Sequence, residues 1–132
     1  MFEWGRAICY SGYRNGQSPK NATYPTYEQI KEDLTLLNEL GFKYLRMYDP
    51  IRYAEETCKV IRDCSFDMQL MLGPGLISEV NNPGCPWNKT NYSEEELKQR
   101  AERNDRNIDE LIRISNENSD VINAVSVGNE NT

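Results

Sequence analysis

The chain has 132 residues, of which 38% are hydrophobic, and this length and composition suit one modest domain. Its formal net charge of -6 argues against nucleic acids and anionic membrane surfaces as partners. No apolar run approaches the ~20 residues of a membrane span, and the residues after Met1 lack the basic and apolar regions of a signal peptide. We therefore expect a cytoplasmic protein if Met1 is the natural start.

The sequence contains no histidine, which excludes Ser-His and Cys-His nucleophile pairs and every histidine-containing metal site. We expect neither a metal ion nor a cofactor. The cysteines show no CxxC spacing, and we interpret them as reduced thiols that serve as small apolar side chains. A disulfide between Cys58 and Cys64, or one with Cys85, stays open as the alternative. The four cysteines are Cys9, Cys58, Cys64 and Cys85.

The first predicted elements are a strand near residues 6–11 and a helix after a long loop. The loop, residues 12–25, is rich in Gly, Asn, Ser and Pro. The helix begins at Thr26, where Gln29 three residues on completes a capping-box pattern, and it ends at Gly41. Its apolar stripe consists of Ile30, Leu34, Leu37 and Leu40.

Two more strands follow, with a second helix between them. The second strand covers residues 44–48 and is stopped by Asp49-Pro50, and the third covers residues 68–72 and is stopped by Gly73-Pro74-Gly75. The helix between them runs roughly over residues 52–63. One side of this helix carries Ala54, Cys58 and Ile61.

A third helix and a fourth strand complete the predicted elements. Ser93 and Glu96 form a second capping box, and the helix runs to about Glu117. Its expected buried stripe is Leu97, Ala101, Ile108, Leu111 and Ile112. The strand, residues 121–130, alternates between two faces, and we expect its Val125 and Val127 side to pack on helices. Its small side, which ends at Glu130, should face a crowded interior.

Strands that alternate with helices imply parallel pairing and right-handed crossovers, which fit both a doubly wound sheet and a barrel. The second and third strands each carry one apolar face, with Leu45, Met47, Leu70 and Leu72, and one polar or mixed face. A doubly wound sheet is covered on both faces and prefers apolar residues on both, so the pattern favours a (β/α)8 TIM-barrel type. Because a complete barrel needs ~250 residues, we expect residues 1–132 to form its first four βα units, a half barrel.

Several segments carry a resemblance to a known family, in its order and spacing and over nearly the whole chain. They are Ile8-Cys9-Tyr10-Ser11-Gly12-Tyr13-Arg14 with Gly16-Gln17-Ser18-Pro19, Arg46-Met47-Tyr48-Asp49-Pro50, Met71-Leu72-Gly73, Glu79-Val80-Asn81-Asn82-Pro83-Gly84-Cys85-Pro86-Trp87 and Ala124-Val125-Ser126-Val127-Gly128-Asn129-Glu130. In these segments the chain resembles the bacterial and fungal branch of glycoside hydrolase family 17, the β-1,3-glucanase-like enzymes of clan A. The resemblance implies a retaining (β/α)8 glycosidase that acts on β-glucan, with β-1,3-glucan as the expected substrate.

The resemblance also implies roles for individual residues. Glu130, at the tip of the fourth strand, matches the family's general acid/base, and Asn129 matches the partner expected to hydrogen-bond the sugar 2-hydroxyl. Tyr48 and Asp49 at the end of the second strand, and Tyr10 at the end of the first, match positions that line the sugar-binding cleft. From the residues alone, each has a simpler alternative: a solvated carboxylate for Glu130, packing for the tyrosines and a turn for Asp49.

Two departures from the family bear on function. The family often has an aromatic residue just after the third strand, where this chain has Pro74-Gly75-Leu76. Its nucleophile is a second glutamate on strand seven, which four strands do not reach. Retaining hydrolysis needs two carboxyl groups ~5–5.5 Å apart, and Glu130 supplies only the acid/base.

A half barrel also leaves strands one and four as open edges, which invite association. Two copies could pair these edges and close an eight-stranded homodimer. The Glu130 of the second copy would then stand at the end of strand eight. The family's nucleophile is on strand seven, so this Glu130 would not replace it. A glycosidase and a transglycosylase both stay open as activities of the family. The alternatives to such an enzyme are a glucan-binding remnant that dimerises and an inactive half barrel.

Overall fold

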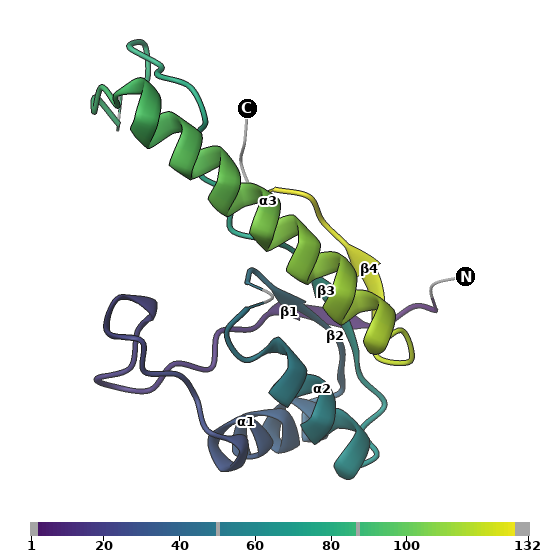
Figure 1. Ribbon diagram of the computed structural model, residues 1–132. Coiled ribbons are helices and arrows are strands. Elements are labelled where there is room, and N and C mark those ends of the chain that lie inside the picture. Colours follow the sequence, from purple (N-terminus) through teal and green to yellow (C-terminus); the bar gives the residue numbers. More distant parts are fainter. Residues whose placement is uncertain (1–2, 50, 87, 129–132) are drawn as a thin grey trace.

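The computed structural model describes residues 3–49, 51–86 and 88–128, which fold into an α/β structure around a four-stranded parallel sheet (Figure 1). This confirms the predicted α/β class and the parallel pairing of the strands. The strands are β1 (Arg6–Cys9), β2 (Phe42–Met47), β3 (Gln69–Leu72) and β4 (Ile122–Val125). The helices are α1 (Tyr27–Glu39), α2 (Ala54–Asp63) and α3 (Glu94–Glu117), with a 3-10 turn at Pro19–Asn21.

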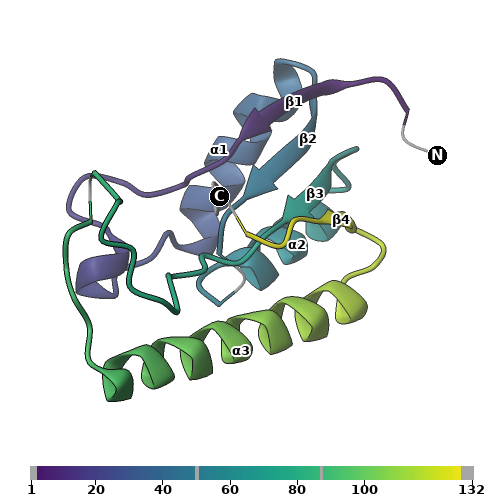
Figure 2. The same ribbon diagram turned by 90° about the horizontal axis from the view of Figure 1, so that it is seen from above.

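The strands lie side by side in chain order, β1-β2-β3-β4. Two rows of register partners run across the sheet, and members of one row point to the same face. The first row is Ile8, Leu45, Leu70 and Ile122, and the second is Cys9, Arg46, Met71 and Ala124. Each helix therefore connects a strand to its immediate neighbour, as the view from above in Figure 2 shows.

Both predicted capping boxes are confirmed. Thr26 Oγ1 accepts the Gln29 backbone N–H at the start of α1, and the Gln29 side chain accepts the Thr26 N–H. Ser93 and Glu96 make the same reciprocal pair at the start of α3. These bonds satisfy backbone donors that have no partner within the helix, which is why a four-residue pattern locates a helix start.

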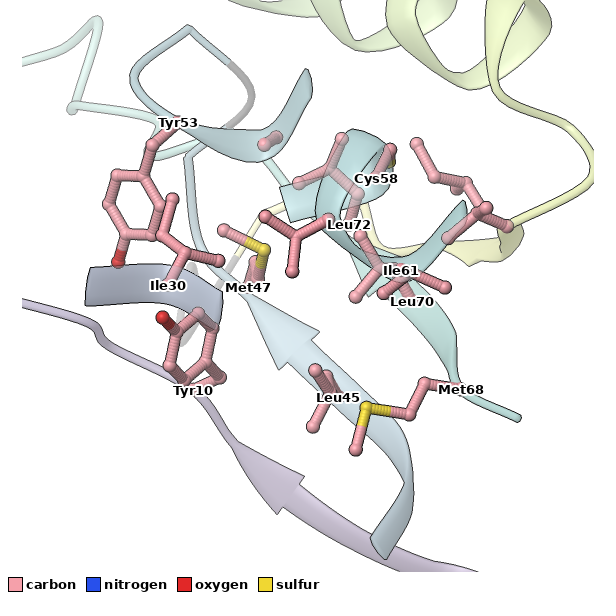
Figure 3. Packing of buried hydrophobic residues seen from close by; sticks show 14 of the residues in the cluster. Tyr10, Ile30, Leu45, Met47, Tyr53, Cys58, Ile61, Met68, Leu70 and Leu72 are labelled. Carbon is pink, nitrogen blue, oxygen red and sulfur yellow. The ribbon is translucent and has the colours of Figure 1, made fainter. Parts of the chain in front are cut away.

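All three helices contribute to one hydrophobic core on one face of the sheet. Figure 3 shows how Ile30 of α1 and Cys58 and Ile61 of α2 lie over the strands. The strands bury Leu45, Met47, Leu70 and Leu72 in it, as their alternation predicts. Burying one such side chain contributes roughly 1.5–3 kcal/mol, so this face dominates the stability of the fold. The helices add Ile30 and Leu34 from α1, Ala54, Cys58 and Ile61 from α2, and Leu111 and Ile114 from α3.

The opposite face of the sheet has a different character. Its residues are exposed or half-buried, and they include the charged Arg46 and the polar Gln69. A pocket of about 270 Å³ lies against it, lined mainly by residues of β1 and β2 together with Met71. The residues that alternate with the core on β1, β2 and β3 are Ala7, Cys9, Tyr44, Arg46, Gln69 and Met71.

Part of the predicted apolar cover is wrong. Leu40 of the α1 stripe is 51% exposed, Ile112 of the α3 stripe is 54% exposed, and Val125 and Val127 are 52% and 69% exposed. One residue rotates a helix by about 100°, so Ile112 lies beside the buried Leu111 and away from the sheet. Val125 shares the register row of the buried Leu72, but β4 is an edge strand and leaves that side open.

The four cysteines are free thiols, as the reduced-thiol interpretation expects. Cys58 is buried in α2, and burial raises the pKa of its thiol to about 12. Within the described residues, none of the helices has the length and apolar character needed to cross a bilayer.

Candidate functional site

The carboxyl ends of all four strands meet at one edge of the sheet. Three backbone hydrogen bonds continue the pairing there: Tyr10 N–H to Arg46 O at 2.9 Å, Gly73 N–H to Met47 O at 3.1 Å, and Ser126 N–H to Leu72 O at 2.9 Å. In parallel α/β folds, ligands bind at this edge because the loops that follow the strands gather there.

Gly73 lets the ends of β3 and β4 approach closely at this edge. A Cβ atom at position 73 would lie 2.8 Å from the carbonyl oxygen of Ser126, closer than real Cβ contacts allow. Glycine at this position therefore preserves the distance at which the Ser126 N–H bonds Leu72.

Tyr48 lies just beyond β2, on the side of the sheet opposite the core. Its hydroxyl donates a hydrogen bond to Cys9 Sγ at 2.9 Å, and the Arg46 guanidinium carbon lies 4.8 Å from the centre of its ring. Cys9 and Arg46 are register partners on neighbouring strands, so the sheet itself holds both contacts. Tyr48 is 38% exposed, and a held, partly exposed aromatic ring at this edge is suited to contact a ligand.

A pocket of about 160 Å³ lies between the loop after β1 and the loop after β2. It brings together three of the residues predicted to bind substrate: Tyr10, Tyr48 and Asp49. The other residues that line it are Ser11, Tyr13, Met47, Arg52 and Tyr53.

Asp49 takes part in two contacts at this pocket. Its Oδ1 accepts the backbone N–H of Ile51 at 2.9 Å, which is the turn role considered from the sequence. Its Oδ2 lies 3.1 Å from Arg52 Nε in a half-buried ion pair, and Arg52 Nη1 donates to the Tyr13 hydroxyl at 3.3 Å. The Asp49 carboxylate therefore both stabilises the turn after β2 and lines the pocket. The hydrogen bond between Arg52 and Tyr13 links the loop after β2 to the loop after β1.

Tyr10 is 6% exposed and belongs to the core (Figure 3). Its hydroxyl donates to Asp33 Oδ2 at 3.1 Å, and its ring meets the Tyr53 ring edge-on, with 6.3 Å between centres. Burial, followed by the nearby Asp33 carboxylate, raises the pKa of the Tyr10 phenol far above its usual value. These surroundings favour the packing alternative for Tyr10, which contributes a wall to the pocket and keeps its hydroxyl occupied.

The loop after β1 is fastened to α1 by Arg14. Its guanidinium donates to Asp33 Oδ2 at 2.9 Å, to the Gln29 carbonyl at 3.1 Å and to Glu32 at 3.2 Å. These contacts, first the hydrogen bond to Asp33, raise the pKa of Arg14. The fastening fixes the part of the loop that carries Tyr13 and so gives the pocket a defined wall.

The loop between β3 and α3 is held by Asn104, which is 3% exposed. Its side chain accepts the Ile77 N–H at 3.0 Å and donates to the Ile77 carbonyl at 2.7 Å and to Glu79 Oε1 at 2.8 Å. Glu79 therefore supports this loop. Figure 1 shows that the loop and the first turns of α3 extend away from the sheet.

The predicted acid/base Glu130 and its neighbour Asn129 lie outside the described residues, as does Trp87. Sequence reasoning missed Tyr13, Arg52 and Tyr53 as pocket residues. The three-residue spacing of Asp49 and Arg52 around Pro50 was the available signal, because it suits an ion pair across the turn that begins α2. In the described part of the chain, no group of three or more acidic or cysteine side chains could hold a metal ion.

Comparisons of the chain with family models, with curated proteins and with solved structures found no match. The pocket at the carboxyl edge therefore carries the functional interpretation, together with the residues that the sequence singled out.

Proposed function

We propose that residues 1–132 form the N-terminal half of a (β/α)8 barrel of the glycoside hydrolase type. The strand order β1-β2-β3-β4 supports this proposal. A doubly wound sheet changes direction at a switch point, and its helices then cover both faces. When the strands instead follow one another in chain order, right-handed crossovers put every helix on the same face of the sheet. The single hydrophobic core found here agrees with this arrangement. The uncovered face, with Arg46 and Gln69, then corresponds to the lumen of the barrel.

The proposed activity is hydrolysis of β-glucan, with β-1,3-glucan as the expected substrate, by a retaining mechanism. Glu130 acts as general acid: it protonates the glycosidic oxygen while a carboxylate nucleophile attacks the anomeric carbon. It then acts as general base and takes a proton from the water that releases the sugar. Asn129 hydrogen-bonds the 2-hydroxyl, and the nucleophile is expected outside these residues.

The observation that carries the proposal is the pocket at the carboxyl edge. Tyr48 and Asp49, two of the residues that the family resemblance assigns to the cleft, line it together at the end of β2. An aromatic ring beside a few placed polar groups is what a sugar site requires, because the ring contacts the C–H face and the polar groups bind hydroxyls.

Sugar release from a linear β-1,3-glucan tests the proposal when formate is added as a small carboxylate nucleophile. A positioned general acid contributes roughly 10²–10⁴-fold, so Glu130→Gln should reduce release at least ~100-fold. Glu117→Gln, at the end of α3, is the matched control and should leave release unchanged. Equal release by the wild-type chain and Glu130→Gln, or no release in the presence of formate, would contradict the proposal.

A second candidate is a glucan-binding remnant that dimerises to close a barrel. The exposed apolar residues at the two edges of the sheet favour it. Val125 and Val127 lie at or just beyond β4, and Leu40, just after α1, lies near β1, where its carbonyl accepts a hydrogen bond from Arg6 at 3.0 Å. Light scattering that shows a dimer, with glucan binding and no sugar release, would support this candidate. A monomer at high concentration would exclude it.

A further inference from the structure

The loop after β1 contains a tight turn at residues 14–17. The Gln17 N–H donates a hydrogen bond to the Arg14 carbonyl at 2.9 Å, and Gly16 has a φ of 83°. A positive φ at the third of four residues matches a type II turn, where glycine is favoured because it has no Cβ atom. The residue before this glycine is Asn15, and the sequence contains no other asparagine that is followed by glycine.

The Asn15 side chain and the Gly16 nitrogen are both open to reaction. Asn15 and Gly16 are exposed, and a Cβ atom at Gly16 would have no neighbour within 4 Å beyond the adjacent residues of the chain. Among the described residues, none forms a hydrogen bond with the Asn15 side chain or with the Gly16 N–H. Asn118 differs in every respect, because it is buried and its side chain binds both Arg62 and the Ile114 carbonyl.

An asparagine in these surroundings can lose its side-chain amide without an enzyme. The Gly16 nitrogen gives up its proton and attacks Asn15 Cγ, since a nucleophile becomes effective when it is deprotonated. A bond forms between this nitrogen and Cγ, the Cγ–Nδ2 bond breaks, and Nδ2 leaves with the added proton as ammonia. Water then opens the cyclic imide at either carbonyl carbon. Opening at the main-chain carbon gives isoaspartate, and opening at Cγ gives aspartate.

The isoaspartyl product changes the backbone at the point where Gln17 fastens the loop. In isoaspartate the main chain runs through Cβ and Cγ of residue 15, which adds one carbon atom to the turn. Gln17 Oε1 accepts the Arg14 backbone N–H at 2.8 Å, and Gln17 Nε2 donates to the Tyr24 carbonyl at 3.1 Å and to Gln29 Oε1 at 2.9 Å. The Gln29 side chain also belongs to the capping box of α1. A longer turn moves Gln17 away from these partners.

We propose that Asn15 is a site of spontaneous deamidation, and that its isoaspartyl product separates Gln17 from the start of α1. The Arg14 guanidinium precedes the modified residue and keeps its bonds to Asp33 and the Gln29 carbonyl. The separation is therefore confined to the part of the loop that follows Asn15. Both products add one negative charge, and water does not restore the amide, so the modified form accumulates as the protein ages.

Ageing of the full 132-residue chain in mildly alkaline buffer, followed by peptide mapping with mass spectrometry, tests the modification. The Asn15 peptide should gain the mass difference between a hydroxyl and an amino group and separate into aspartyl and isoaspartyl forms. Its rate should rise about tenfold per pH unit, because the anionic fraction of a weakly acidic N–H rises in that proportion. The peptide with Asn118, which precedes the small Ser119, is the internal control and should stay unmodified. Asn15→Gln should also stay unmodified, because its longer side chain would have to close a larger ring.

Hydrogen exchange tests the structural consequence by comparing the purified isoaspartyl form with Asn15→Asp. This variant carries the same added charge on an unaltered backbone. The loss of one backbone hydrogen bond corresponds to roughly fivefold faster exchange. The Gln17 N–H should therefore exchange at least ~5-fold faster in the isoaspartyl form and at the wild-type rate in Asn15→Asp. Amides of α3 should exchange alike in all three proteins.

Two results would overturn the proposal. Modification of Asn15 that is no faster than that of Asn118, or that does not depend on pH, would show that the turn is not a deamidation site. Equal exchange of the Gln17 N–H in the isoaspartyl form and in Asn15→Asp would show that the longer backbone does not separate Gln17 from α1.

Discussion

Replacing Asp33 with alanine should lower the free energy of unfolding by about 2 kcal/mol. The substitution removes the acceptor of the Tyr10 hydroxyl, which is almost fully buried. Leaving a buried donor without a partner costs roughly 1–3 kcal/mol. The loss of the Arg14 pair adds little, because Arg14 is about one-third exposed, keeps Glu32, and such pairs contribute ~0–1 kcal/mol.

A double-mutant cycle separates the hydrogen bond from other effects of the substitution. Tyr10→Phe removes the unsatisfied donor, so Asp33→Ala should cost about 1 kcal/mol less in that background. Urea unfolding followed by circular dichroism measures each variant, and the dependence on urea should keep its slope. This reasoning would be refuted if the losses of unfolding free energy from Asp33→Ala and Tyr10→Phe were strictly additive in the double variant. A loss below ~0.5 kcal/mol for Asp33→Ala alone would also refute it.

Two further predictions concern the carboxyl edge and the start of α3. Gly73→Ala should destabilise the fold by ~1–3 kcal/mol through the clash with Ser126, whereas Gly75→Ala, with its nearest neighbour at 3.7 Å, should be far milder in the same urea assay. Hydrogen bonds from the Ser93 backbone and hydroxyl lower the pKa of Glu96 below its ordinary 4.5. The capping contact should therefore be complete above pH 4.5 and be lost as the pH falls through the lowered value. Amide hydrogen exchange in the first turn of α3 should therefore become faster as the pH falls and the capping contact is lost. In Glu96→Gln this pH dependence should disappear. The same pH dependence in both proteins would contradict the role of the Glu96 carboxylate in the cap.

Local patterns predicted the elements well because their causes lie within a few residues. The capping boxes at Thr26 and Ser93 depend on groups three residues apart, and the structure contains both. The alternation of Leu45 and Met47 with polar neighbours predicted which face of β2 is buried, because successive side chains of a strand point in opposite directions.

Features that depend on neighbouring elements were harder to predict. Ile112 and Val127 belong to apolar patterns, yet both are exposed. Ile112 lies one position beyond the buried Leu111 on α3 and turns away from the sheet, and Val127 follows β4, the edge strand of the described sheet. The pocket posed the same difficulty: Tyr13 and Arg52 are 39 positions apart and meet only because β1 and β2 are neighbours. A sequence pattern identifies the candidate pocket residues that follow one strand. It does not identify the pocket residues that come from the loop after the neighbouring strand.

The most direct test of the proposed acid/base is the product formed with azide from a phenyl β-glycoside of a β-1,3-linked glucose disaccharide. In the proposed reaction, azide attacks the anomeric carbon from the side opposite the leaving oxygen, the C–O bond breaks, and Glu130 gives its proton to the phenolate. We expect an α-configured glycosyl azide from the wild-type chain and a roughly 100-fold slower reaction in Glu130→Gln. No glycosyl azide, or equal rates in the two chains, would contradict the role of Glu130.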